Sequence, residues 1–392
     1  MEETNNQNQN NVKKFPEGFI WGASTASYQV EGGIENNDWA EAAREGKVPI
    51  AGRGTDQYHL YEKDFDLAKS MGHTGHRFSL EWSRIEPEEG KFSIEAFHHY
   101  RAVLTALRER SIRPFVTIWH FTLPIWFVKK GGFLNPEAPE IFARYAKKVT
   151  EELGNESLYW MTINEPLVYS SNGYMRGTWP PFAKNPFKFW RVVNNLIRAH
   201  ILAYREMKAV YSRLQIGVAK NNMDFKSNWN PINVLLSKVS KQIWNNKFLN
   251  GIKNDVDFIG INYYFQKIFG LTYKGEKTDM GWPISPDGLK QVLLEANKYG
   301  KPIYVTENGL ADTTDKLRTD FLKKHLEAVW GAIQEGANIK GYLYWSLIDN
   351  YEWAHGFGPR FGLIEVNYET LERIPRLSAE FYSDIIRRNG II

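Results

Sequence analysis

Short runs of apolar and aromatic residues recur along the chain and alternate with longer amphipathic segments. Several runs are almost continuously apolar, which is typical of strands that are buried on both faces of a parallel sheet. Gly, Pro, Asn or Asp stands at most of their boundaries, where strands are expected to end. The pattern predicts eight strands, at Phe19–Ser27, Thr74–Leu80, Pro114–His120, Tyr159–Glu165, Ile216–Asn221, Asp257–Tyr264, Ile303–Asn308 and Gly341–Asp349.

The segments between these runs have the apolar spacing of amphipathic helices. In Asp56–Met71, for example, Tyr61, Phe65 and Ala68 fall on one stripe, and Gly72 follows at a position that favours a helix end. Prolines and glycines mark the starts and ends of several other segments in the same way. The further helices are predicted at Ile94–Arg110, Pro136–Leu153, Lys188–Tyr211, Pro286–Tyr299, Asp315–Glu335 and Leu377–Arg388.

The regular alternation of strand and helix, with no break in composition, predicts one parallel α/β domain. Eight strands in 392 residues favour a closed (β/α)8 barrel over an open, doubly wound sheet. The weak repeat is Ser212–Asp255, where only Pro231–Leu249 has helical character, so we expect a short or irregular segment between strands five and six. The polar residues 1–14 are interpreted as a disordered tail, and residues 15–392 as the barrel domain.

Composition excludes several classes of protein. A net charge of +4 with scattered basic residues gives no footprint for nucleic acid, and the absence of cysteine excludes thiolate metal sites and cysteine nucleophiles. The nine histidines form no metal constellation, and no nucleotide-binding loop occurs, so neither a metal nor a cofactor is expected. Charges interrupt every apolar run, and no signal sequence is recognised. We therefore expect a cytoplasmic protein without a membrane partner, whose oligomeric state the sequence leaves open.

Polar and ionisable residues cluster at the predicted strand ends. In a (β/α)8 barrel the carboxyl ends of the strands carry the catalytic groups, whereas a structural strand end has no need of them. Any single motif of this kind is compatible with an ordinary turn, but their occurrence at nearly every strand favours a site. The residues concerned are Gln29, Arg77, His120, Asn164, Glu165, Asn262, Tyr264, Glu307, Trp345, Glu352 and Trp353.

Glu165 and Glu307 are distinctive because each closes an apolar strand. Two neighbouring buried carboxyl groups are costly unless they serve a purpose. Hydrolysis of a glycosidic bond needs such a pair, one group to protonate the leaving oxygen and the other to meet the positive charge at the anomeric carbon. Their proximity would raise the pKa of the acid, while a cation, for which Arg77 is the candidate, would keep the other group ionised.

With these residues the chain resembles family 1 of the glycoside hydrolases, the retaining β-glucosidase and β-glycosidase family. The resemblance extends from Phe15 to about Gly390. It is carried by Phe19-Ile20-Trp21-Gly22, Ser27-Tyr28-Gln29-Val30-Glu31-Gly32, Arg77-Phe78-Ser79, Trp82-Ser83-Arg84-Ile85, Thr162-Ile163-Asn164-Glu165-Pro166, Val305-Thr306-Glu307-Asn308-Gly309 and Trp345-Ser346-Leu347 through Trp353. These motifs in this order are highly specific.

The resemblance implies that Glu165 is the general acid/base and that Glu307 is the nucleophile of a covalent glycosyl intermediate. Arg77 and Tyr264 are implied to hold Glu307 ionised and oriented, and Trp345 to form the platform under the sugar. The implied substrate-binding residues are Gln29, His120, Asn164, Asn262, Trp345, Glu352, Trp353 and Phe361.

The resemblance also restricts the substrate. Relatives that act on 6-phosphorylated sugars lack a carboxylate at the position of Glu352, and thioglucosidases carry Gln at that of Glu165. The expected reaction is therefore hydrolysis of terminal, non-phosphorylated β-D-glycosides, β-glucosides first, with β-galactosides and β-fucosides plausible. A small β-glycoside or oligosaccharide is the expected partner. Two alternatives stay open: a transglycosidase that uses the same intermediate, and a non-catalytic sugar-binding barrel.

The sequence departs from the family pattern in three respects. Phe121 follows His120 where many members have Trp, and Glu81 stands where many are apolar. The stretch Asn222–Val256 and the loops after Tyr264 and Gly309 are shorter than is usual in the family. Because these loops normally build the aglycone side, we expect a widened mouth with weakened selectivity for the leaving group.

Overall fold

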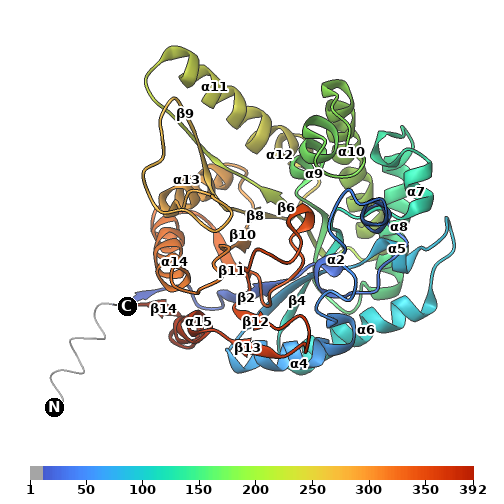
Figure 1. The fold of residues 1–392 in the computed structure, drawn as a ribbon, viewed down its shortest axis with the longest axis horizontal. Helices are drawn as coiled ribbons and strands as arrows, with labels where there is room; N and C mark the ends of the chain where they lie inside the picture. Colours follow the sequence, from blue (N-terminus) through green and yellow to red (C-terminus); the bar gives the residue numbers. More distant parts are fainter. Residues whose placement is uncertain (1–11) are drawn as a thin grey trace.

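The computed structural model describes residues 12–392 and contains the predicted closed barrel at its centre (Figure 1). Every neighbouring pair of barrel strands is parallel, including the pair that closes the barrel between the first and last strands. The (β/α)8 fold is therefore confirmed. The barrel strands are β2 (Ile20–Ser24), β3 (Gly75–Ser79), β4 (Arg113–Trp119), β5 (Tyr159–Asn164), β6 (Gln215–Asn221), β8 (Phe258–Asn262), β10 (Ile303–Asn308) and β11 (Ile339–Trp345).

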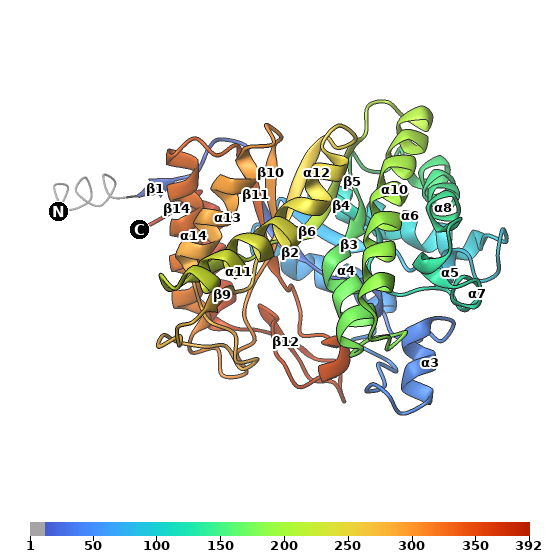
Figure 2. The same cartoon turned by 90° about the horizontal axis from the view of Figure 1, so that it is seen from above.

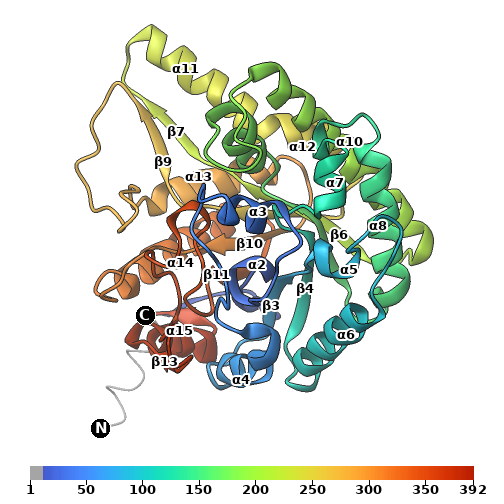
Figure 3. The same cartoon turned by 45° about the vertical axis from the view of Figure 1, so that its right-hand side comes forward.

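Helices surround the barrel and cover its outer face (Figure 3). In α8, Ile141, Phe142, Tyr145 and Val149 lie on one buried face, because their spacing brings them to the same side of the helix. The long helices follow the predicted segments closely, since each has such an apolar face. They are α4 (Gln57–Ser70), α6 (Ile94–Glu109), α8 (Ala138–Leu153), α10 (Pro186–Val210), α13 (Pro286–Asn297), α14 (Arg318–Gln334) and α15 (Leu377–Arg388).

Shorter elements occupy the connections between strands and helices. Among them, β12 and β13 form an antiparallel pair after the last barrel strand. The shorter elements are α2 (Ser27–Val30), α3 (Asp38–Arg44), α5 (Trp82–Ile85), α7 (Ile125–Lys129), η1 (Gly132–Leu134), α9 (Pro166–Ser170), η2 (Ser171–Arg176), η4 (Trp353–His355), β12 (Ile364–Val366) and β13 (Arg373–Pro375).

The interior of the barrel is filled with side chains. Aromatic rings dominate it, with Phe115 stacked on Tyr159 at 4.5 Å between ring centroids and in edge contact with Tyr304 at 5.2 Å. This cluster is separate from the larger core between the strands and the helices. The barrel is thus a packed core, and only the carboxyl ends of its strands are left to carry chemistry. Its inner cluster comprises Ile20, Phe115, Met161, Ala219, Phe258, Tyr304 and Leu343.

The segment between β6 and β8 is irregular, as predicted. Helices α11 (Pro231–Lys241) and α12 (Lys247–Ile252) follow one another through the π-helical turn η3 (Gln242–Asn246). Before α11, strand β7 (Asp224–Ser227) pairs in parallel with β9 (Gln266–Phe269). Figures 1 and 2 show that α11 extends away from the barrel, which explains why its sequence lacks the usual inward apolar face.

Two boundaries differ from the sequence prediction. Lys13 and Lys14, assigned to the tail, form β1, which pairs with the last strand β14 (Gly390–Ile391). The first predicted strand ends at Ser24, and Gln29 lies on the short helix α2. Both features depend on long-range pairing or on a turn that local periodicity does not record. The predicted tail otherwise lies mostly in residues 1–11, outside the described residues.

Candidate active site

The predicted site residues meet at the carboxyl ends of the barrel strands. Glu165 follows β5 directly, and Glu307 is the second-to-last residue of β10. Both side chains are buried. The backbone of Glu165 has φ 42°, a left-handed conformation that costs a residue other than glycine free energy. Strain of this kind is concentrated at functional sites, and here it turns the chain from the strand into α9.

Two groups bind the Glu307 carboxylate. The Tyr264 hydroxyl donates to Oε2 at 2.5 Å, and the Arg77 guanidinium forms a buried ion pair with Oε1. Arg77 is itself fixed by donation from Nε to Thr117 Oγ1 at 3.0 Å. Because Tyr264 is buried beside two carboxyl groups, the pKa of its hydroxyl is raised well above the usual value, so it stays a donor. Glu307 is therefore held as an oriented anion.

A hydrogen-bonded network joins the two glutamates. Asn164 Oδ1 accepts from Arg77 Nη2 at 2.6 Å and from Asn262 Nδ2 at 3.2 Å. The same Asn262 amide donates to Glu165 Oε1 at 2.9 Å. The network thus runs from Glu307 through Arg77, Asn164 and Asn262 to Glu165. Residues from four barrel strands are brought together as the sequence predicted.

Burial raises the pKa of Glu165 above its ordinary value, and the negative charge of Glu307 raises it further. The amide of Asn262 and the charge of Arg77 act in the opposite direction but are outweighed. A carboxyl group with a raised pKa keeps its proton near neutral pH and can donate it. The two carboxyl groups thus differ in their surroundings: Glu165 has a raised pKa, whereas Glu307 lies in an ion pair with Arg77. Hydrolysis of a glycosidic bond needs a pair with such different surroundings.

A further set of polar side chains belongs to the predicted site: Gln29, His120 and Glu352. Gln29 Nε2 donates to Asn350 Oδ1 at 3.0 Å and lies 3.4 Å from Glu352 Oε2. Its Oε1 atom and Nδ1 of His120 are buried without a hydrogen-bond partner within the described residues. Burial, with the charges of Glu307 and Glu165, raises the pKa of Glu352 to about 8. These atoms are free to bind a polyhydroxylated molecule.

Aromatic rings form the wall next to these polar groups. His120 is nearly parallel to both Trp345 and Trp353, at 6.1 and 5.9 Å between ring centroids. Trp39 and Trp179 pack behind Trp353, at 4.7 and 5.6 Å. The sequence prediction missed Trp39 and Trp179, because both lie in connections and not at strand ends. The aromatic content of the chain was their only signal.

Phe361 lies in a second aromatic group, which shares Trp345 with the first. Its ring is 6.2 Å from Tyr264 and 6.1 Å from Trp282, and it clusters with Trp345. Trp282, on the long connection after β9, also contacts Tyr264 at 5.5 Å and was not predicted. Tryptophans therefore occur in both aromatic groups next to the predicted site residues. A further buried residue that the sequence analysis missed is Lys220, on β6.

The two unusual residues have distinct places in the structure. Phe121 fills the space between Trp353 and Trp179, at 5.1 and 5.0 Å, so it supports the wall. Glu81 is fully buried and accepts hydrogen bonds from Thr122 Oγ1 at 2.9 Å and from Ser83 Oγ at 2.5 Å. Glu81 thus links the connections that follow β3 and β4 through buried hydrogen bonds.

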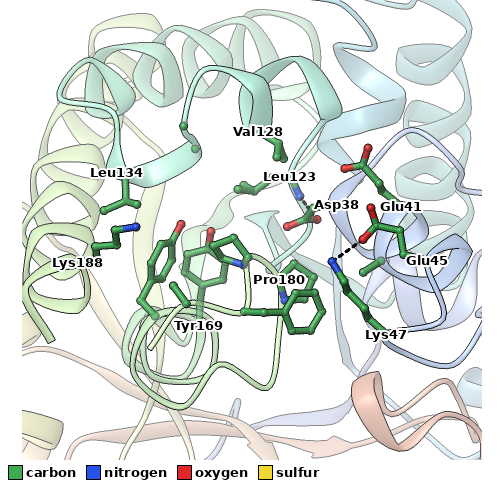
Figure 4. A pocket seen from close by; sticks show the side chains of 17 residues that line it. Asp38, Glu41, Glu45, Lys47, Leu123, Val128, Leu134, Tyr169, Pro180 and Lys188 are labelled. Atoms are coloured by element: carbon green, nitrogen blue, oxygen red, sulfur yellow. Dashed lines mark hydrogen bonds and ion pairs between the residues drawn. The ribbon is translucent and has the colours of Figure 1, made fainter. Parts of the chain in front are cut away.

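A separate cavity of about 410 Å³ lies away from the two glutamates (Figure 4). Asp38, Leu123, Tyr169 and Pro180 are among the residues around it, and neither Glu165 nor Glu307 lines it. Among residues 12–392, no group of three or more histidine or acidic side chains is arranged to hold a metal.

A (β/α)8 barrel with an acid and an ionised carboxylate joined at its strand ends defines the class of glycoside-cleaving barrel enzymes. Comparison with known proteins agrees. The model of glycosyl hydrolase family 1 matches residues 11–250 and 235–391. β-Glucosidase A of Thermotoga maritima is 33% identical, and the match covers 97% of this chain and 99% of that protein. The chain belongs to glycosyl hydrolase family 1 and is an O-glycoside hydrolase.

Solved structures show the same relationship. A β-glycosidase from Pyrococcus horikoshii superposes with a TM-score of 0.92 at 38% identity, covering 97% of this chain and 96% of that one. The β-glucosidase from Thermotoga maritima in complex with glucoimidazole gives a TM-score of 0.93 at 32% identity, covering 97% and 100%. The family and fold expected from the sequence motifs are thus confirmed.

Proposed function

We propose that this enzyme hydrolyses terminal, non-phosphorylated β-D-glycosides with retention, in two displacement steps. The observation that carries the proposal is the network from Glu165 through Asn262, Asn164 and Arg77 to Glu307. It holds one carboxyl group protonated and the other ionised at the ends of β5 and β10, two strands on different parts of the barrel wall. A non-catalytic sugar-binding barrel would have no need to keep two buried carboxyl groups in opposite states.

In the first step, Glu165 donates its proton to the glycosidic oxygen and the bond from this oxygen to the anomeric carbon breaks. A carboxylate oxygen of Glu307 attacks the anomeric carbon and forms a covalent α-glycosyl ester. Arg77 and Tyr264 keep the Glu307 carboxylate ionised and aimed until it attacks. Breaking the Tyr264 hydrogen bond as the ester forms would release the oxygen that becomes bonded to the sugar.

In the second step, Glu165, now ionised, removes a proton from water, and the water oxygen attacks the anomeric carbon. The ester bond to Glu307 breaks, the carboxylate is restored, and the sugar leaves with its β configuration. Esterification removes the negative charge of Glu307, one cause of the raised pKa of Glu165. Glu165 therefore keeps its proton until the ester forms and gives it up more readily afterwards, so it is ionised when the second step needs a base.

We assign the remaining predicted residues to binding of the terminal sugar. The buried, unpartnered atoms of Gln29 and His120 support contacts with sugar hydroxyl groups. Trp345 provides an aromatic face for the sugar. Trp353, which follows Glu352 in the chain, provides a second ring. Asn164, Asn262 and Phe361 complete the set, with Asn164 placed for the 2-hydroxyl group, where contacts strengthen in the transition state.

β-Glucosides are the proposed first substrates, because the Thermotoga maritima relative is a β-glucosidase and its solved structure holds glucoimidazole. β-Galactosides and β-fucosides are further candidates. The half-buried carboxyl group of Glu352 supports a neutral sugar over a 6-phosphorylated one, because it offers a phosphate no positive charge and repels it whenever it is ionised. We also propose that residues 15–392 act as one domain. Location in the cytoplasm stays a prediction.

The test is hydrolysis of nitrophenyl β-D-glucoside followed by proton NMR of the first product. The proposal expects β-glucose to appear first and the α anomer to follow by mutarotation. A parallel panel of glucoside, galactoside, fucoside and 6-phosphoglucoside should rank the 6-phosphoglucoside last. Sugar transfer to added alcohol exceeding hydrolysis would favour the transglycosidase, and α-glucose as first product would exclude the retaining mechanism.

A further inference from the structure

Helix α11 exposes its apolar side to solvent. Ile232, Leu235, Leu236 and Val239 have the spacing of one helix face, and 68%, 60%, 45% and 46% of their surface is exposed. Trp229, in the connection just before the helix, is 95% exposed. We call these five residues the α11 apolar face. In a covering helix of an α/β protein the apolar side normally turns inward, so the arrangement here is reversed.

The inward side of α11 is held by polar contacts. Ser237, the helix residue that is buried, donates from its hydroxyl to the carbonyl oxygen of Phe225 on β7 at 2.9 Å. Asn233 donates to Asn228 Oδ1 at 2.9 Å. These bonds fix the orientation of the helix on the β7–β9 pair. The outward direction of the apolar face is therefore built into the fold.

The same region of the chain carries only positive charge. Residues 225–254 contain five lysines and no Asp or Glu. Two of the lysines are paired with acidic residues of neighbouring elements, Lys226 with Asp224 and Lys241 with Glu295. The other three are exposed and have no ion-pair partner within residues 12–392: Lys238, Lys247 and Lys253.

The α11 apolar face lies on the side of the barrel that carries the active site. Strands β7 and β9, which support α11, continue from the carboxyl ends of β6 and β8 (Figures 1 and 2). Leu271, 60% exposed, follows Gly270, whose carbonyl oxygen accepts from Asn228 next to Trp229. The apolar surface therefore extends from α11 to the end of the β7–β9 pair.

We propose that the α11 apolar face docks the enzyme on an anionic lipid surface, together with Lys238 on the same helix and with Lys247 and Lys253 on and just after α12. A helix that lies in a membrane interface combines apolar residues, Trp among them, with basic residues that attract anionic lipids. A second copy of this chain fits less well, because symmetric contact would bring two sets of unpaired lysines together. The expectation of no membrane partner rested on the lack of a spanning segment, and none of the helices in the described part of the chain is long and apolar enough to span a bilayer.

Docking is tested by co-sedimentation of the full chain with sucrose-loaded vesicles. We expect binding to vesicles of phosphatidylcholine with about 30% phosphatidylglycerol and little binding to phosphatidylcholine alone. Binding should weaken as salt is raised, because the lysine contribution is screened. The tryptophan fluorescence of the bound enzyme should shift to shorter wavelength as Trp229 leaves water.

Two sets of variants separate the contributions. The triple variant Trp229→Ser/Leu235→Ser/Leu236→Ser should bind anionic vesicles at least about tenfold more weakly, since most of the apolar area is removed. Phe187→Ser is the matched control, because Phe187 is equally exposed, at 84%, on α10. Lys238→Glu/Lys247→Glu should weaken binding to anionic vesicles, whereas Lys323→Glu, on an exposed part of α14, should not. Circular dichroism confirms that each variant is folded.

The proposal is independent of the catalytic assignment, since binding is measured without turnover. Failure of the wild-type chain to bind anionic vesicles would overturn it, as would equal binding by the triple variant. Light scattering measures whether the α11 apolar face instead binds a second copy of the chain. A dimer that the triple variant abolishes, together with no vesicle binding, would assign the face to a second copy and overturn the proposal. Loss of binding confined to the α11 variants supports the lipid surface.

Discussion

Glu165 and Glu307 illustrate at the scale of single residues how position produces chemistry. Both are glutamates at strand ends, but Glu307 is bound by a guanidinium and a phenol, whereas Glu165 receives one amide. Burial and the neighbouring anion then raise the pKa of Glu165. The two roles follow from the surroundings and not from the side chains themselves.

The first prediction concerns the charge coupling between them. Replacement Glu307→Gln removes an anion that raises the pKa of Glu165, so that pKa should fall. Carbon NMR of carboxyl-labelled glutamate measures it directly by titration. Glu369→Gln, at an exposed position, is the control and should leave the Glu165 titration unchanged. An unchanged Glu165 pKa in Glu307→Gln would show that the two groups do not interact.

The second prediction concerns pH dependence. A raised pKa means that Glu165 keeps its proton through neutral pH and loses it as pH rises further, so kcat/KM should fall on the alkaline side. In Glu165→Gln this alkaline fall should disappear. The variant should lose roughly 10²–10⁴-fold on substrates with poor leaving groups and much less on dinitrophenyl glucoside, which needs no acid. An alkaline limb that persists in Glu165→Gln would belong to another group.

At the residue scale, the sequence predicted those site members that stand at strand ends. Glu165, Glu307 and Arg77 are recognisable because a charged residue interrupts or closes an apolar run. Trp39 and Trp179 were missed because they come from connections, where position in the chain gives no information on position in space. Only the closed barrel brings them behind Trp353.

The connection after β11 depends, at the scale of elements, on a buried acid. Asp349 has no exposed surface, and its carboxylate accepts from Arg376 at 2.8 Å and from the Gly362 amide at 2.9 Å. It thereby joins the chain that carries Glu352 and Trp353 to the segment before α15. The shape of the site thus rests on an ion pair that lies outside it.

The third prediction follows from this anchor. Asp349→Ala removes the buried partner of Arg376 and leaves this arginine only a longer contact with an exposed carboxylate, so the free energy of unfolding should fall by about 3–5 kcal/mol. Urea denaturation followed by circular dichroism measures the change. Glu365→Gln is the matched control, because Glu365 is half exposed and lies 3.6 Å from the same arginine, so it should change stability by less than about 0.5 kcal/mol. Equal effects from the two variants would contradict the anchoring role.

Elements with an inward apolar face were predictable and those without one were not. Helices α8 and α10 lie within a few residues of their predicted ranges, since they bury one face on the barrel. The segment that contains α11 was predicted to be irregular because it is polar and rich in Asn, and the structure shows that the apolar residues of α11 face outward. Strand β1 has two lysines and exists because the chain ends pair, which local sequence does not record.

The length of the chain is informative at the scale of the whole molecule. The match to the Thermotoga maritima β-glucosidase extends over 443 residues, more than the 392 of this chain, so that relative carries additional residues. Both proteins nevertheless share the barrel over almost their full lengths. The sequence prediction that the missing residues fall at the rim, after strands five to seven, stays a prediction.

The fourth prediction tests the rim. With short connections, few contacts discriminate among leaving groups, so kcat/KM for phenyl, octyl and cellobiosyl glucosides should agree within about tenfold. The Thermotoga maritima relative, assayed beside it, is the comparison and should show a wider spread. Discrimination by this chain as strong as in the relative would show that the rim is complete.

We assign attack on the anomeric carbon to Glu307 and proton transfer to Glu165. Glu307→Gly should lower kcat at least about 10³-fold, and added azide should restore cleavage by entering the space of the missing carboxylate. We expect Glu307→Gly to form α-glucosyl azide. The matched variant Glu165→Gly should form β-glucosyl azide, because there azide attacks the glycosyl enzyme. Wild-type turnover by Glu307→Gly, or β-glucosyl azide from it, would contradict the assignment.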